Sequence, residues 1–93
     1  INKYNKELDI KIFTDYGCFI GINKPSLFNS FKHQEISFFT ENKYLKIKTS
    51  GLKYNFNYTT LTTLYNGTLN QSLNNKFFVD IKNGNLIVYL KYN

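Results

Sequence analysis

The 93-residue sequence has one cysteine, one proline and no alanine, arginine, methionine or tryptophan. A single cysteine excludes an internal disulfide framework and any site that needs several thiolates. No apolar run approaches the roughly 20 residues that a membrane-spanning helix requires, so the sequence predicts no membrane span. The chain is also too short for a second hydrophobic core, and we therefore expect a single domain over residues 1–93.

The residues that are abundant instead are mostly those with AT-rich codons. Asn, Lys, Ile, Phe and Tyr make up more than half of the chain, whereas alanine, the best helix former, is absent. This bias, together with Ile1 in place of a starting methionine, favours an organelle-encoded protein on the matrix side of mitochondria; a parasite or symbiont genome is the alternative. Glu7, Asp9 and Lys11 interrupt any apolar region near the N-terminus, so no signal peptide is predicted.

Alternation of polar and apolar residues predicts most of the chain to be β-strand. The expected strands cover residues 8–13, 18–22, 35–40, 43–49 and 52–58, while residues 26–32 form either a helical turn or a loop. In the fourth strand, Leu45 and Ile47 point to one face, and Tyr44, Lys46 and Lys48 point to the other.

One segment carries a helical pattern. Residues 60–73 place an apolar side chain at every fourth position: Leu61, Tyr65, Leu69 and Leu73. The alternative is a two-residue hairpin turn at Asn66-Gly67 between threonine-rich strands.

The C-terminal part predicts a β-hairpin that turns at Asn83-Gly84, because this pair suits a type I′ turn with positive φ at both residues. The hairpin would set three apolar pairs on one face: Ile81 with Leu86, Val79 with Val88, and Phe77 with Leu90. The expected fold is therefore α+β, a mostly antiparallel sheet covered by the helix over residues 60–73.

No motif identifies a reaction. The six acidic residues are spread along the chain, and one cysteine with one histidine cannot supply a zinc shell without carboxylates. Cys18 lies among apolar neighbours, as an inert buried thiol does, and His33 with Glu35 is a spacing that chance produces often. We accordingly expect no catalysis, no cofactor, no metal and no small-molecule substrate.

The net charge of +6 points instead to a polyanion as partner. The predicted RNA-binding residues are lysines that match phosphate spacing and a tyrosine that can stack on bases: Lys43, Lys46, Lys48, Lys53, Tyr44, Lys76, Lys82 and Lys91. The alternative is that these lysines merely solvate the surface.

Residues 42–51, followed by Leu64-Tyr65-Asn66-Gly67 and by residues 83–90, resemble the large-subunit ribosomal protein L-six family in order and character. The resemblance implies a ribosomal RNA-binding protein built of a sheet and a helix, with Lys46, Lys48 and Lys53 as RNA contacts. The sequence departs from the family pattern where Thr49 and Ser50 replace a glycine-proline pair, and it lacks the family's second basic domain.

These observations predict a structural constituent of a mitochondrial ribosome, with ribosomal RNA and neighbouring ribosomal proteins as partners. The alternative is a non-catalytic accessory subunit of another large organellar or viral assembly, since tyrosine is enriched at protein interfaces. A small secreted domain is a third hypothesis, suited by Asn-X-Ser/Thr triplets at Asn57, Asn66 and Asn70.

Overall fold

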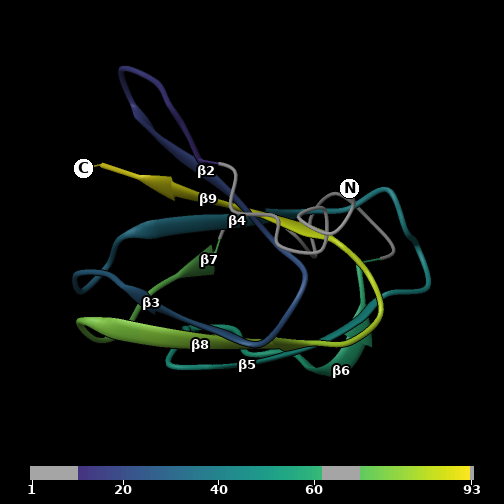
Figure 1. The fold of residues 1–93 in the computed structure, drawn as a ribbon. Coiled ribbons are helices and arrows are strands. Elements are labelled where there is room, and N and C mark those ends of the chain that lie inside the picture. Colours follow the sequence, from purple (N-terminus) through teal and green to yellow (C-terminus); the bar gives the residue numbers. More distant parts are fainter. Residues whose placement is uncertain (1–10, 62–69, 93) are drawn as a thin grey trace.

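The computed structural model describes residues 11–61 and 70–92, which form a sandwich of two antiparallel sheets (Figure 1). The five-stranded sheet has the order β1 (Lys11–Phe13), β2 (Gly17–Ile22), β9 (Leu86–Lys91), β4 (Glu35–Phe39) and β7 (Asn70–Gln71). The four-stranded sheet has the order β3 (Ser26–Asn29), β8 (Lys76–Ile81), β5 (Lys46–Ser50) and β6 (Asn57–Thr60).

The hydrophobic core lies between the two sheets. Strands such as β5 and β8 alternate buried and exposed residues, as expected for strands with one face on the core. The core cluster takes its side chains from both layers: Ile22, Phe28, Ile36, Phe38, Leu45, Ile47, Leu52, Phe77, Val79, Ile81, Leu86 and Val88. The predicted inward faces of residues 43–49 and of the C-terminal part are confirmed.

The predicted C-terminal hairpin is wrong. β8 pairs with β3 and β5, whereas β9 pairs with β2 and β4, so the two strands lie in different sheets. Asn83 has φ +59°, but Gly84 does not share the left-handed conformation that a type I′ turn requires at both positions. Burial of Ile81 and Leu86 therefore comes from opposing layers rather than from a shared face.

The α+β expectation is also wrong, because the structure contains strands and no helix within residues 11–61 and 70–92. The predicted helix over residues 60–73 ends in strands on both sides: Thr60 closes β6, and Asn70–Gln71 forms β7 against β4. Its middle, with the alternative turn at Asn66-Gly67, lies outside the described residues. Threonine favours strands and turns over helices because its branched Cβ restricts rotamers.

Two further segments differ from expectation. Residues 26–32 contain the strand β3, in which Phe28 faces the core and Leu27 faces outward. The strand predicted over residues 52–58 is a loop until β6 begins at Asn57. Of the strand predicted over residues 8–13, only the part from Lys11 is described, as β1.

Buried polar side chains hold the loop between β5 and β6. Thr49 Oγ1 accepts a hydrogen bond from the Phe56 amide at 3.0 Å and donates one to Asn55 Oδ1 at 3.0 Å. Asn70 from β7 donates its amide to the Tyr54 carbonyl at 2.8 Å and accepts from the Tyr54 amide at 3.0 Å. The loop is therefore tied to both sheets, which a run of apolar residues alone would not achieve.

Candidate functional site

Two connections between the layers run together at one end of the sandwich. Residues 40–45 lead from β4 to β5, and residues 82–85 lead from β8 to β9. Thr40 Oγ1 donates a hydrogen bond of 2.8 Å to the Asn85 carbonyl, which joins them. Gly84 packs so closely that a Cβ on it would lie 2.7 Å from Leu45 Cδ1.

The first of these connections is ordered by its own hydrogen bonds. The Tyr44 amide donates to Asn42 Oδ1 at 2.9 Å, and the Asn42 amide donates to Thr40 Oγ1 at 3.1 Å. The Leu45 amide donates to the Asn42 carbonyl at 3.1 Å. Asparagine and threonine side chains commonly fix tight turns in this way, so the connection is a preformed wall for the hollows on either side of it.

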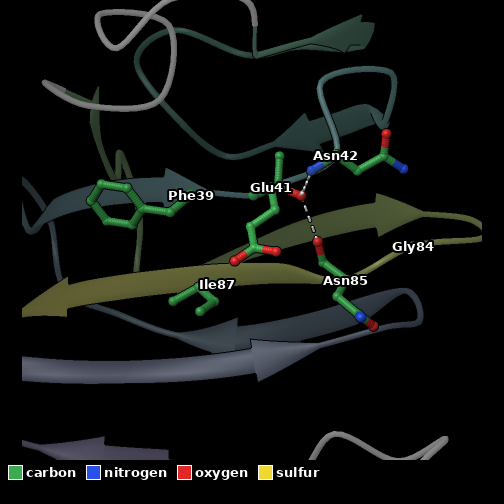
Figure 2. Close-up of a pocket in the computed structure, with 7 residues that line it drawn as sticks. Phe39, Glu41, Asn42, Gly84, Asn85 and Ile87 are labelled. Carbon is green, nitrogen blue, oxygen red and sulfur yellow. Dashed lines mark hydrogen bonds between the residues drawn. The ribbon is translucent and has the colours of Figure 1, made fainter.

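The acidic hollow lies on the side of the five-stranded sheet and has a volume of about 650 Å³. Its lining comes from β4, β9 and both connections: Phe39, Thr40, Glu41, Asn42, Gly84, Asn85 and Ile87 (Figure 2). Phe39 and Ile87 are paired across the strands and remain 37% and 43% exposed. The Glu41 side chain extends toward Ile87 (Figure 2), so the lining of the hollow combines a carboxylate with two partly exposed apolar side chains.

The basic hollow lies on the side of the four-stranded sheet and has a volume of about 400 Å³. It is lined by residues of both connections and of the strands β5 and β6: Asn42, Tyr44, Leu45, Lys46, Tyr58, Lys82 and Asn83. None of these lining residues carries a carboxylate, whereas two carry an ammonium group. Asn42 lines both hollows, which therefore adjoin each other across one connection.

Tyr58 has an unusual backbone and an unusual partner. It stands where the register between β5 and β6 shifts, and its φ is +55°, in the left-handed region. Its hydroxyl donates a hydrogen bond of 3.0 Å to Asp80 Oδ2, and the Lys48 ammonium lies 5.4 Å from its ring centroid. The hydrogen bond to the Asp80 carboxylate, and then that carboxylate's charge, raise the pKa of Tyr58 above its ordinary value of 10.0.

The structure brings together only some of the residues predicted to bind RNA. Tyr44, Lys46 and Lys82 line the basic hollow. Lys43 lies in the first connection, where its ammonium is 5.5 Å from the Tyr44 ring centroid. Lys48 lies two residues after Lys46 on β5.

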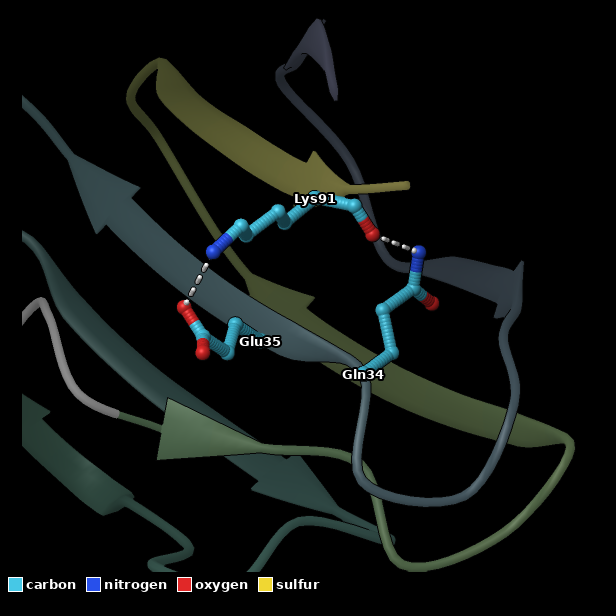
Figure 3. Close-up of polar contacts among 3 residues, drawn as sticks. All are labelled: Gln34, Glu35 and Lys91. Atoms are coloured by element: carbon cyan, nitrogen blue, oxygen red, sulfur yellow. Dashed lines mark hydrogen bonds and ion pairs between the residues drawn. The ribbon is translucent and has the colours of Figure 1, made fainter. Parts of the chain in front are cut away.

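The other predicted lysines lie elsewhere. Lys53 is in the loop after β5, and Lys76 is at the opposite end of β8 from Lys82. Lys91 belongs to the other sheet, where its ammonium lies 3.5 Å from Glu35 Oε1 and its carbonyl accepts a hydrogen bond from Gln34 (Figure 3). The eight residues therefore do not form one continuous patch.

The residues considered for catalysis show no catalytic arrangement. Cys18 is buried in β2 and its Sγ lies 3.8 Å from the Phe19 carbonyl, while His33 is exposed. Among the residues that the structure places, no three His, Cys, Asp or Glu side chains group as metal ligands do. No helix in this part of the chain is long and apolar enough to cross a membrane.

The sequence pattern did not reveal the acidic hollow. The pattern predicts a strand over residues 35–40 that contains Phe39 and ends next to Glu41, and it does not indicate that Ile87 pairs with Phe39. They meet because two chain crossings more than 40 residues apart are adjacent in space, as the Thr40–Asn85 hydrogen bond shows. Glutamate at the end of a strand that carries an exposed aromatic residue was the only local signal.

Comparison with known proteins gives a consistent family. The family model described as "Thiamin pyrophosphokinase, substrate-binding domain" matches residues 17–89. Thiamine pyrophosphokinase from Bacillus subtilis is similar in structure, with a TM-score of 0.74, 16% identity, and coverage of 88% of this chain and 40% of that one. No curated protein matches the sequence.

Two further solved structures have the same fold. Thiamin pyrophosphokinase from Geobacillus thermodenitrificans has a TM-score of 0.69 at 11% identity, with coverage of 90% of this chain and 41% of that one. A protein from Lactobacillus plantarum has a TM-score of 0.73 at 10% identity, with coverage of 97% and 45%. The chain thus spans less than half the length of each of these structures.

These matches overturn the functional expectations. The likeness to a ribosomal protein family is wrong, and with it the role in a ribosome and the partnership with ribosomal RNA and ribosomal proteins. The accessory-subunit alternative is not favoured either. The expectation of a protein with no enzymatic role and no small-molecule substrate is contradicted, because the description of the matching family names a pyrophosphokinase and the binding of its substrate. The mitochondrial location stays a prediction.

Proposed function

The chain belongs to the thiamin pyrophosphokinase substrate-binding domain family, and we propose that it holds thiamin as the substrate-binding part of such an enzyme. The solved relatives are more than twice as long as the segment that matches them. We therefore assign transfer of the diphosphate group to protein outside this sandwich. The scattered acids and the lone histidine of the described residues support this division.

The chemistry of the acidic hollow carries the proposal. Thiamin consists of a positively charged thiazolium ring joined to an aminopyrimidine ring, so its site needs a negative charge next to apolar surface. Glu41 supplies the carboxylate, and Phe39 and Ile87 supply partly exposed apolar side chains in the same hollow. A volume of about 650 Å³ is within the range of small-molecule sites.

Each group has a distinct part in binding. The Phe39 ring attracts a cation through its π face, an interaction of roughly 0.5–2 kcal/mol that strengthens as water is excluded. Glu41 stabilises the same positive charge by direct Coulomb attraction, which partial enclosure by the two connections makes stronger than in free solution. Ile87 buries the ring edge. Together these contacts select a flat cation over a neutral ring of the same size.

Calorimetric titration of the full chain with thiamin tests the proposal. We expect saturable binding, and we expect Glu41→Gln to weaken it roughly tenfold, because about 1.4 kcal/mol of attraction to the cation is lost. Glu35→Gln is the matched control, since Glu35 lies on the same strand β4 outside the hollow and should leave thiamin affinity unchanged.

A second ligand sharpens the test. Thiochrome, the uncharged ring-closed product of thiamin oxidation, should bind the wild-type chain more weakly than thiamin and should be insensitive to Glu41→Gln. Absence of thiamin binding, or equal affinity of the wild-type and Glu41→Gln chains, would contradict the proposal.

A further inference from the structure

We infer that the basic hollow is a second ligand site, which binds a phosphate group carried by a small molecule. Lys46 and Lys82 both line it, and its described lining includes no carboxylate. The two acids nearest in sequence to these lining residues are not part of the lining themselves: Asp80 accepts the hydrogen bond of Tyr58, and Glu41 lines the acidic hollow beyond Asn42. The described lining of the hollow therefore carries two positive charges and no negative one.

The register of the sheet places the two lysines opposite each other. β5 and β8 pair with Ile47 against Ile81 and Lys48 against Asp80. Continuing this antiparallel register by one residue sets Lys46 opposite Lys82. Like charges directly opposite each other across a sheet destabilise it, whereas Lys48 and Asp80, two residues further along the strands, are complementary. An anion between Lys46 and Lys82 removes that repulsion.

Backbone conformation gives an independent indication of a ligand site. In the described part of the chain, three non-glycine residues have positive φ, and two of them, Tyr58 at +55° and Asn83 at +59°, line the basic hollow. Residues held in such sparsely populated conformations concentrate at ligand sites, where the surrounding structure over-determines them. The same two residues flank the lysine pair from β6 and from the second connection.

The walls of the hollow define the class of ligand. Ammonium groups bind phosphate as strongly hydrated point charges, and two of them fit a group with two or more oxygens. The Tyr44 side chain is 75% exposed beside them, and besides its contact with Lys43 its ring offers an aromatic surface on which a flat group attached to the phosphate can stack. Free phosphate and an aromatic phosphate ester share the chemistry that the lysines recognise.

Titration followed by amide NMR shifts of the full chain tests this inference. The probes are inorganic phosphate, inorganic pyrophosphate and adenosine monophosphate at constant ionic strength. We expect saturable shifts confined to the residues around Lys46, Tyr58 and Lys82. Lys46→Gln and Lys82→Gln should each weaken pyrophosphate binding about fivefold, and the double variant should abolish it, because each removes one unscreened charge.

Lys76→Gln is the matched control, because Lys76 is an exposed lysine on β8 at the end away from the hollow. It should change pyrophosphate affinity by less than a factor of two. Tighter binding of adenosine monophosphate than of inorganic phosphate would identify an aromatic ester as the ligand class, and equal binding would identify the phosphate group alone. No saturable binding of any probe, or an equal loss in Lys76→Gln, would overturn the inference. None of the probes contains thiamin, so the result is separate from that of the acidic hollow.

Discussion

At the scale of single residues, the neighbours of Tyr58 determine the pKa of its hydroxyl. Its hydroxyl is bonded to Asp80, and its ring lies near the Lys48 ammonium. The phenol must lose its proton next to a carboxylate that already carries negative charge, and it must give up the hydrogen bond as well. Both effects favour the protonated phenol and explain why the pKa of Tyr58 is raised.

We predict that Asp80→Asn lowers the pKa of Tyr58 toward its ordinary value of 10.0. Tyrosine labelled with ¹³C at Cζ gives one NMR signal per ring, so the titration of Tyr58 can be followed directly. The raised folded pKa means that the protonated phenol stabilises the fold below pH 10, and that this contribution is lost as pH rises through the folded pKa.

Asp15→Asn is the control for this titration, because it removes an exposed carboxylate from the turn between β1 and β2. It should leave the Tyr58 titration in place. An unchanged midpoint for Tyr58 in Asp80→Asn would show that the hydrogen bond does not persist in solution.

At the scale of the elements, the alternation of residue types predicts which residues are buried, but it does not predict which strands pair. Leu45, Ile47, Val79 and Val88 face the core as their alternation indicates. The pattern is the same whether the next strand is a hairpin partner or lies across the core, because both arrangements bury the same face. The turn at Asn83-Gly84 is therefore equally compatible with a hairpin and with a crossing between layers.

The described ends of the segment over residues 60–73 differ from the predicted helix for another reason. An apolar residue at every fourth position is typical of a helix, but Asn70 and Ser72 are buried and hydrogen bonded to other parts of the chain. Hydrogen bonds to distant parts of the chain do not alter the spacing of apolar residues, so the spacing cannot indicate them. Tertiary hydrogen bonds thus decide the structure at this end of the segment.

The anchoring role of Asn70 leads to a stability prediction. Asn70→Ala removes the side chain that bonds both backbone groups of Tyr54, and it leaves those groups without their partner. We expect a loss of roughly 2 kcal/mol in the free energy of unfolding, the typical penalty for unpaired polar groups in a protein interior. Urea unfolding followed by circular dichroism measures this loss.

Asn75→Ala is the matched control, because Asn75 is an exposed asparagine in the connection that leads to β8. It should change the free energy of unfolding by less than about 0.5 kcal/mol, as surface substitutions usually do. Equal effects of the two substitutions would show that the bonds to Tyr54 contribute nothing specific.

At the scale of the whole molecule, both hollows follow from strand order rather than from any local motif. Each of the two connections must pass from one sheet to the other at the same end, which sets Glu41 and Lys46 on either side of Asn42. The sequence shows the basic residues, and part of the predicted set does gather in the basic hollow. It does not show which crossings are adjacent, and so the acidic hollow was not foreseen.

The same strand order predicts slow folding. β2 pairs with β9, so that Cys18 lies opposite Leu90 across most of the chain, and few strand pairs are local. Closing such long loops comes before the contacts that stabilise them, and all-β domains of this kind fold in milliseconds to seconds. Stopped-flow refolding from urea, followed by tyrosine fluorescence, should give relaxation times in this range. Complete refolding within about 100 μs would contradict the prediction.

Cys18 gives this sandwich an internal chemical reporter. Cys18 is 6% exposed and lies on β2 between β1 and β9, and its thiol holds the only sulfur atom in the chain. A thiol reagent cannot reach it while those three strands stay together. The rate at which Cys18 is alkylated therefore measures how often the strands β1, β2 and β9 separate. No probe has to be engineered into the protein for this measurement.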